Sequence, residues 1–267
     1  MNSSPLPLDS EQINREASAL LSVRGNRMRM ILASLIVLST VVCYAVLSSA
    51  FDYAIARLFG MLTSDHPYFL LVKYCYFLFL VVTMIYFTVP LALGLLHMAY
   101  LISEERETAL SDLFHFFSSR KEYKRASDLS FWLLVRLSPA YVLMELIYAW
   151  AIHITDNIYW GGTLAGAMIV CEIILLLFTF FWRFYSAYLL CAEHTMEPHI
   201  ARFVEKRMTK HYGFRVGFCH FWGSLLDILL SVSTMGIYFF VEALPKMLIS
   251  YFCICRKSIS LIIQTEE

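Results

Sequence analysis

The chain has 267 residues, of which 59% are hydrophobic and 16% are charged, whereas a soluble domain is typically about half apolar and about a quarter charged. The 21 acidic and 21 basic residues balance, so no overall charge argues for a nucleic-acid partner or a polyanionic substrate. This composition predicts an all-α integral membrane protein, because the excess of apolar residues must face lipid.

Residues 1–28 are predicted to form a disordered start and then an amphipathic helix. A polar stretch precedes the first apolar run without the arrangement of a signal peptide, so we expect that run to be retained. Asp9 or Ser10 would cap the helix. Its apolar face, typical of a helix at a membrane interface, consists of Ile13, Ala17, Leu20 and Leu21.

Six apolar runs follow, each close to or above the roughly 20 residues that cross a hydrocarbon core about 30 Å thick. They predict a bundle of six transmembrane helices in a membrane domain over 29–257, followed by a C-terminal tail over 258–267. The spans are expected at about 29–52, 68–101, 129–153, 163–190, 216–232 and 236–255.

The basic residues predict the orientation, because translocation of positive charge is disfavoured. Lys and Arg gather before the first span, in 103–128, in 191–215 and directly after the last span. The connections 58–67, 154–162 and 233–235 carry none. Both termini are therefore predicted to lie in the cytoplasm, with an even number of spans.

The two long cytoplasmic connections are predicted to contain basic amphipathic helices on the inner leaflet. In TALSDLFHFFSSRKEYKR and in EPHIARFVEKRMTKHYGF, apolar residues recur at helical spacing beside bases. In the first segment the apolar residues are Leu110, Leu113, Phe114 and Phe117. The candidate lipid-surface contacts are Arg120, Lys121, Lys124, Arg125, Arg202, Lys206, Arg207 and Lys210. The alternative is that both helices pack on the membrane domain and keep a solvated charged face.

Seven charged residues fall inside predicted spans, where charge is costly and normally faces a partner in the bundle interior. They are Arg136, Glu145, Glu172, Arg183, Asp227, Glu242 and Lys246. From the helical rise of about 1.5 Å per residue, Glu145 and Glu172 would share one depth, and the two arginines another. These residues either form a polar pathway for protons or ions, or are neutralised one by one by groups that fix the helix order.

The stretch STMGIYFFVEALPKMLIS predicts a hairpin between the last two spans. Thr234 to Gly236 supply a turn, and Pro245 removes a backbone donor and favours a kink. Glu242 and Lys246 are four residues apart in the order that favours an ion pair. The stretch is either a re-entrant-like hairpin whose charges pair with each other, or a broken helix that shapes a solute site, as transporters use.

The sequence contains no catalytic motif of the HExxH, GxSxG, Walker or dinucleotide-loop type. The segment AEHTMEPH misses the spacing of inverted zinc proteases, and Pro198 would turn the chain between its histidines. The seven cysteines lie in or beside apolar runs without paired spacing. We therefore expect no enzyme activity, no cofactor and no metal site.

From 182 to 252 the sequence runs from a tyrosine-rich helix end through a basic helix to Thr-x-Gly-Ile and a closing aromatic pair. The residues of this pattern are Tyr185, Tyr188, Glu193, Pro198, Met208, His211, Trp222, Thr234, Gly236, Ile237, Pro245, Tyr251 and Phe252. With REASALLSVRGNRMRM and VPLALGLLHMAYLISEERETALSDLFHFF, the pattern resembles a bacterial multi-pass membrane family known as domain of unknown function nine-seven-five. Glu205 and Lys246 depart from it. The resemblance implies a bacterial inner-membrane protein without an assigned activity.

The function expected is that of a non-enzymatic membrane component, either a transport-associated subunit or a small permease. The alternative is a structural or regulatory protein that binds anionic lipid or a protein partner through the basic helices. The expected partners are membrane lipids and either another membrane protein or a second copy of the chain.

Overall fold

A computed structural model describes residues 9–23, 25–59, 75, 79, 82–132, 135, 185–193, 196–234 and 237–266. This part of the chain is helical and contains no strand, as the predicted all-α class requires. In chain order the elements are α1 (Ser10–Ser22), α2 (Asn26–Phe59), the π-helix η1 (Met84–Thr88), α4 (Val89–Ser103), the 3-10 helix η2 (Leu110–Phe117), a helix over 120–132, α7 (Tyr185–Ala192), α8 (Pro198–Ser233), the π-helix η3 (Phe239–Ala243) and α9 (Leu244–Glu266).

The N-terminal amphipathic helix is present as α1. Asp9 caps it by accepting a hydrogen bond of 3.0 Å from the backbone N–H of Glu11. Ile13, Ala17 and Leu21 are buried, and the helix packs on α9 and α8. Its apolar face is therefore covered by protein, rather than by lipid as the interfacial interpretation predicted.

α2 follows directly on α1 after a turn at Gly25, whose φ of 93° is easily reached only without a side chain. At about 1.5 Å per residue the helix is about 51 Å long. The first turns of α2 pack in the core, where Met30 and Ala33 are fully buried. Farther along, its apolar side chains are exposed; they include Val41, Val42, Val46, Leu47 and Tyr53.

In the described residues, two helical stretches are long and apolar enough to cross a membrane, namely Asn26–Tyr44 in α2 and Tyr86–Ser103 in η1 and α4. The two stretches differ in their surroundings. Few residues of the first are buried, whereas most residues of the second are buried inside the protein. Most of predicted spans three and four, 129–153 and 163–190, lies outside the described residues.

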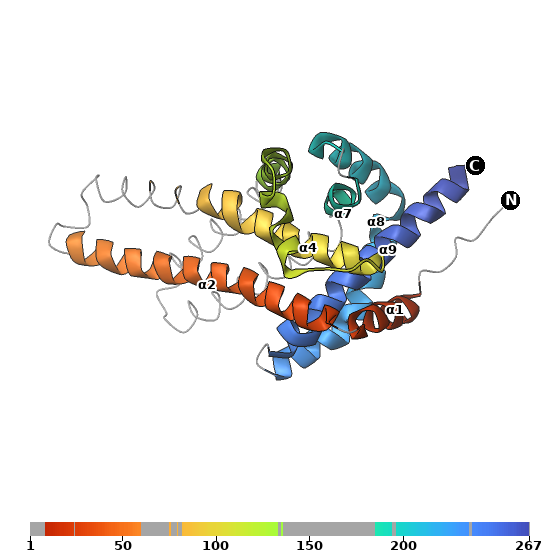
Figure 1. Ribbon diagram of the computed structural model, residues 1–267, viewed down its shortest axis with the longest axis horizontal. Coiled ribbons are helices and arrows are strands. Elements are labelled where there is room, and N and C mark those ends of the chain that lie inside the picture. Colours follow the sequence, from red (N-terminus) through yellow and green to blue (C-terminus); the bar gives the residue numbers. More distant parts are fainter. Residues whose placement is uncertain are drawn as a thin grey trace, which may run out of the picture.

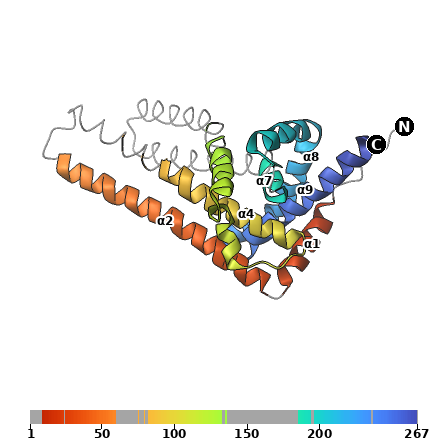
Figure 2. The ribbon, with the colours of Figure 1, turned by 45° about the horizontal axis from the view of Figure 1, so that its top comes forward.

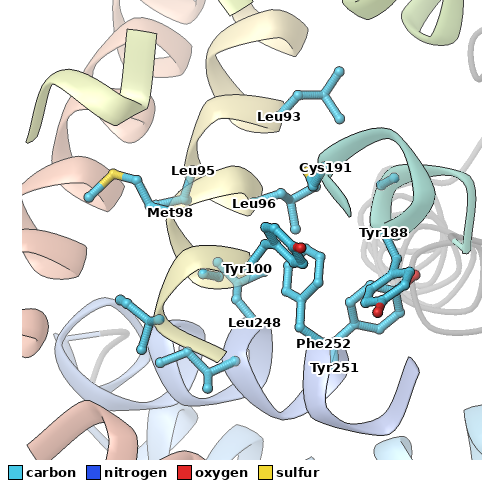
Figure 3. Close-up of a cluster of buried hydrophobic side chains, with 14 of the residues drawn as sticks. Leu93, Leu95, Leu96, Met98, Tyr100, Tyr188, Cys191, Leu248, Tyr251 and Phe252 are labelled. Carbon is cyan, nitrogen blue, oxygen red and sulfur yellow. The ribbon is translucent and has the colours of Figure 1, made fainter. Parts of the chain in front are cut away.

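α4 lies at the centre of the core and contacts α2, η2, α7 and α9. A Cβ atom added at Gly94 would stand 1.8 Å from the carbonyl oxygen of Leu113, so only glycine lets η2 lie this close. Figure 3 shows Tyr100 of α4 meeting Tyr188 of α7 and Phe252 of α9. The ring centroid of Phe252 lies 5.9 Å from that of each tyrosine, so these rings hold three helices together.

The segment η3–α9 lies across one end of the α2–α4 pair (Figures 1 and 2). Near its beginning, Glu242 pairs with Arg27 in the first turn of α2. Farther along, Arg256 donates a hydrogen bond of 2.9 Å to the carbonyl of Ser103, the last residue of α4. These contacts are separated by about 21 Å of helix. The predicted sixth span therefore crosses these helix ends instead of running beside α2 and α4, so the structure does not support a six-span bundle.

Three predicted segments differ in detail. The basic helix after Pro198 and the predicted fifth span form one continuous helix, α8. The segment 110–117 is a 3-10 helix, and because this helix has about three residues per turn it buries Leu113 and Phe116, while Phe114 is exposed. α9 stays helical to Glu266, beyond the boundary at 258 that we predicted for a tail.

Candidate functional site

A cluster of charged and hydroxyl side chains joins α2, α8, η3 and α9, and we call it the junction cluster. Lys246 Nζ lies 2.9 Å from Asp227 Oδ2, and the hydroxyl of Tyr238 donates to Asp227 Oδ1 over 3.1 Å. The second ion pair of the cluster joins Glu242 to Arg27. Tyr238 interacts electrostatically with Glu242 and Arg27 as well as with Asp227. The cluster thus holds two acids and two bases, and each charge is paired.

Three of the seven residues predicted for a polar interior, Asp227, Glu242 and Lys246, are brought together here. The predicted ion pair between Glu242 and Lys246 is wrong, because each has its partner on another helix. The π-helix η3 ends between the two residues, and its wider turn moves them off a common helical face. Arg136, Glu145, Glu172 and Arg183 lie outside the described residues, so their two layers stay a prediction.

Sequence reasoning missed Arg27 and Tyr238. Arg27 served only as one of the basic residues that predict the cytoplasmic side. In the predicted six-span bundle, Glu242 would lie near the opposite surface of the membrane. The ion pair between them contradicts that depth. The pairing of Asp227 with Lys246 could have been predicted from the sequence. Asp227 lies seven residues before the predicted turn at 234–236 and Lys246 lies ten residues after it, so a hairpin brings the two residues to similar levels.

A second polar cluster lies where α1, α4 and α9 meet, and we call it the terminal clasp. Glu16 accepts from Arg256 over 2.9 Å and from Lys257 over 2.5 Å. Arg256 also donates to Ser103 and lies 3.6 Å from the carboxylate of Glu104. The clasp connects the beginning of the described chain to its end.

Arg125 is not a lipid contact as predicted, because its side chain is buried. Its guanidinium donates to the carbonyl oxygens of Leu190, Glu193 and Met196 at 3.2, 2.7 and 3.1 Å, and to the carboxylate of Glu122 at 2.6 Å. These carbonyls lie in the last turn of α7 and in the chain after it. Arg125 therefore satisfies orphan acceptors at a helix end.

Arg120, Lys121 and Lys124, by contrast, are exposed. They lie beside an aromatic group in which the hydroxyl of Tyr123 donates to the carbonyl of Tyr86 over 2.8 Å. The ring centroid of Phe117 lies 5.8, 6.5 and 5.7 Å from the ring centroids of Phe87, Phe114 and Tyr123, respectively. We call these residues the interfacial collar; it consists of Tyr86, Phe87, Phe114, Phe117, Tyr123, Arg120, Lys121 and Lys124.

Of the predicted contacts on α8, Arg202 lies over the ring of Trp132 at 4.3 Å and donates to the carbonyl of Pro198. Partial burial lowers the pKa of the Arg202 guanidinium. Lys206 is exposed, as is the neighbouring Phe203. The side chains of Arg207 and Lys210 lie outside the described part of the structure.

Among the described residues, the side chains form ion pairs and an aromatic surface. Within the described ranges, no group of three or more His, Cys, Asp or Glu side chains could hold a metal ion. Comparison with protein families, with curated proteins and with solved structures found no match to this chain. The resemblance to the bacterial membrane family therefore stays an expectation.

Proposed function

We propose that this chain is a non-enzymatic multi-pass membrane protein, a transport-associated subunit or regulatory component that binds anionic lipid on the cytoplasmic side of a bacterial inner membrane. The observation that carries the proposal is the interfacial collar. Tyrosine and other aromatic side chains gather at the headgroup level of membrane proteins. Exposed lysine and arginine beside them attract anionic headgroups.

The position of the collar at η1, directly before α4, supports a membrane boundary near Tyr86. From Tyr86 to Ser103 the helix rises about 25 Å. The connection after Ser103 folds back along it, since Leu113 contacts Gly94 and Tyr123 contacts Tyr86. That connection carries exposed charges from 105 to 107, which would be costly in hydrocarbon. We therefore infer that α4 lies on the water side of the collar and that the membrane begins before it.

The orientation belongs to the same proposal. Three groups of basic residues favour the cytoplasmic side, because translocation of positive charge is disfavoured. They are the bases of the collar, the bases before α2 and the bases of 191–215. The terminal clasp supports an even number of spans, because it holds α1 and the end of α9 on one side. The bacterial inner membrane is implied by the family resemblance alone.

The test is native mass spectrometry of the full chain, extracted from its own membrane, because this reports bound lipids, partners and stoichiometry together. We expect retained anionic lipid. Charge reversal at Arg120, Lys121 and Lys124 should weaken that preference, by about 1 kcal/mol for each charge near the surface and less at high salt. Arg57→Glu is the matched control, because Arg57 is an exposed base in the last turn of α2 and does not belong to the collar. Equal lipid retention in both variants at every salt concentration contradicts the proposal.

A small permease is the second candidate, and the junction cluster is the observation that bears on it. Buried acids and bases can mark an ion pathway. In this cluster, however, each charge has a partner on another helix, which favours the role of fixing helix order. The permease proposal therefore rests on Arg136, Glu145, Glu172 and Arg183. A partner-free particle that retains a small ligand would favour the permease, and a stoichiometric partner or second copy would favour the subunit.

A further inference from the structure

One exposed face of the helix over 120–132 changes from charged to apolar along its length. Its first exposed side chains are the three bases of the collar, and Asp128 follows on the same face. Phe131 and Trp132 come next and are 57% and 46% exposed. From Asp128 to Trp132 the helix rises about 6 Å, which is about the thickness of one headgroup layer. A helix that passes from headgroups into hydrocarbon shows this order, because charge is costly beyond that layer.

The beginning of α8 meets this helix at the point where its exposed face becomes apolar. Cζ of Arg202 lies 4.3 Å from the centroid of the Trp132 ring, and its Nε donates to the carbonyl of Pro198. The guanidinium also interacts electrostatically with the carboxylate of Asp128. Arginine suits such a position, because its planar group stacks on aromatic rings and is weakly hydrated. The first turns of α8 are thereby held beside the end of the helix over 120–132 (Figures 1 and 2).

Large apolar side chains are exposed in these turns of α8 as well. Phe203 is 71% exposed and Ile200 is 44% exposed, whereas Ala201 and Glu205 are buried. Lys206, three residues after Phe203 and therefore on the same side of the helix, is exposed too. Exposed aromatic and aliphatic side chains next to a base are typical of a helix at a membrane surface. The name boundary patch is used below for Phe131, Trp132, Ile200 and Phe203.

We propose that the boundary patch contacts lipid acyl chains and that the first turns of α8 lie along the cytoplasmic surface of the membrane. The inference rests on the proposed function, which places the membrane boundary near Tyr86, and adds a second place where the protein meets that boundary. The collar and the patch are connected, because Tyr123 donates to the carbonyl of Tyr86 and Trp132 lies about 14 Å farther along the helix of Tyr123.

Three features favour lipid over a protein partner on the patch. The third predicted span begins at about 129, so the sequence predicts the entry into hydrocarbon at the same point. Tryptophan is enriched where membrane proteins cross the interface. Arg202 offsets the charge of Asp128, which lowers the cost of an acid beside hydrocarbon. Because the patch consists of uncharged side chains, its contact with lipid should not depend on headgroup charge or on salt, in contrast to the collar.

The first test measures whether lipid reaches Trp132. The full chain is placed in nanodiscs of phosphatidylcholine that is brominated near the glycerol end of its acyl chains, and the fluorescence of Trp132→Phe is subtracted from that of the wild type. The matched control is Trp222→Phe. Trp222 is exposed, and the next residue, Gly223, accepts a hydrogen bond from Asn14 of α1, in the part of the protein that the proposed function places in water. We expect bromine to remove most of the Trp132 contribution and little of the Trp222 contribution.

A Trp132 contribution that brominated lipid does not quench would overturn the proposal. Equal quenching of both contributions would also overturn it, and with it the membrane boundary near Tyr86, because the second half of α8 would then lie in lipid. Charge reversal at the three bases of the collar should leave the quenching of Trp132 unchanged. Lipid contact at the patch and anionic lipid binding by the collar can therefore fail separately.

The second test identifies what covers Phe203. The photoreactive residue p-benzoylphenylalanine replaces Phe203 in the full chain, membranes are illuminated, and the mass of the adduct is measured. We expect adducts with phospholipid. Val23, which is 56% exposed directly after α1, is the control position and should give no lipid adduct. A crosslink from position 203 to protein, or the absence of a lipid adduct there, would overturn the proposal.

Discussion

Asp227 and Lys246 show how a single contact can fix two helices. The side chain of Asp227 is 5% exposed and that of Lys246 is 18% exposed, so both charges are largely removed from solvent. The free energy gained by such a pair is offset by desolvation, but the loss of one partner leaves the other buried and uncompensated. The pair therefore specifies the register of α8 against α9 more than it adds stability.

We expect Asp227→Asn to lower the free energy of unfolding by about 3–5 kcal/mol, because Lys246 is left without its counter-charge. The double variant Asp227→Asn with Lys246→Met should be more stable than the single one. Denaturant titration in detergent measures both. The control is Arg15→Gln, which breaks a pair with Glu11 whose side chains are 78% and 72% exposed, and it should cost less than about 1 kcal/mol. Equal costs at the two sites would show that burial does not set the effect.

Among the elements, η2 and α4 depend on one glycine for their contact. Gly94→Ala should destabilise the protein by about 3 kcal/mol or more, because the new Cβ meets the backbone of Leu113, which cannot move without shifting η2. Gly223→Ala is the matched control. Its added Cβ would lie 2.8 Å from the side-chain amide nitrogen of Asn14, which donates a hydrogen bond to the carbonyl of Gly223. Moving that side chain costs about 1 kcal/mol for the hydrogen bond, and this cost is offset because alanine favours helix by about 1 kcal/mol over glycine. Similar losses in the free energy of unfolding for Gly94→Ala and Gly223→Ala would contradict this prediction.

The positions of helices were easier to predict than their surroundings. The apolar periodicity of α1 identified Ile13, Ala17, Leu20 and Leu21; Leu20 is partly buried and the other three are buried. The same pattern could not tell whether protein or lipid covers that face. Arg125 shows the limit most clearly. Its neighbour Lys124 is exposed, and besides Glu122 its hydrogen-bond partners are three carbonyls that lie 65, 68 and 71 residues away. Local spacing carries no information about such contacts.

For the candidate site, hydropathy found three members of the junction cluster, Asp227, Glu242 and Lys246, but not their partners Arg27 and Tyr238. A run of apolar residues such as 236–255 has the composition of a span and also that of a core helix. Only the ion pair between Glu242 and Arg27 and the hydrogen bond from Arg256 to Ser103 show that this helix crosses the ends of others. The distinction depends on tertiary contacts, which composition does not encode.

On the scale of the whole molecule, the terminal clasp predicts that both ends of the chain lie on one side of the membrane. Glu16 of α1 binds Arg256 and Lys257 of α9 directly, and ion pairs do not form across a hydrocarbon core about 30 Å thick. The excess of lysine and arginine near α1 and after the collar favours the cytoplasmic side for both.

Epitope tags at the two ends, probed with a protease in intact spheroplasts and in inverted membrane vesicles, test this arrangement. We expect both tags to be cleaved in inverted vesicles and both to be protected in spheroplasts. A periplasmic loop of an unrelated inner-membrane protein serves as the opposite control. If the two tags were cleaved from opposite sides, the number of spans would be odd. Because α1 and α9 would then have to separate, the clasp would not exist in the membrane, and the packing of α1 on α8 and α9 would fail with it.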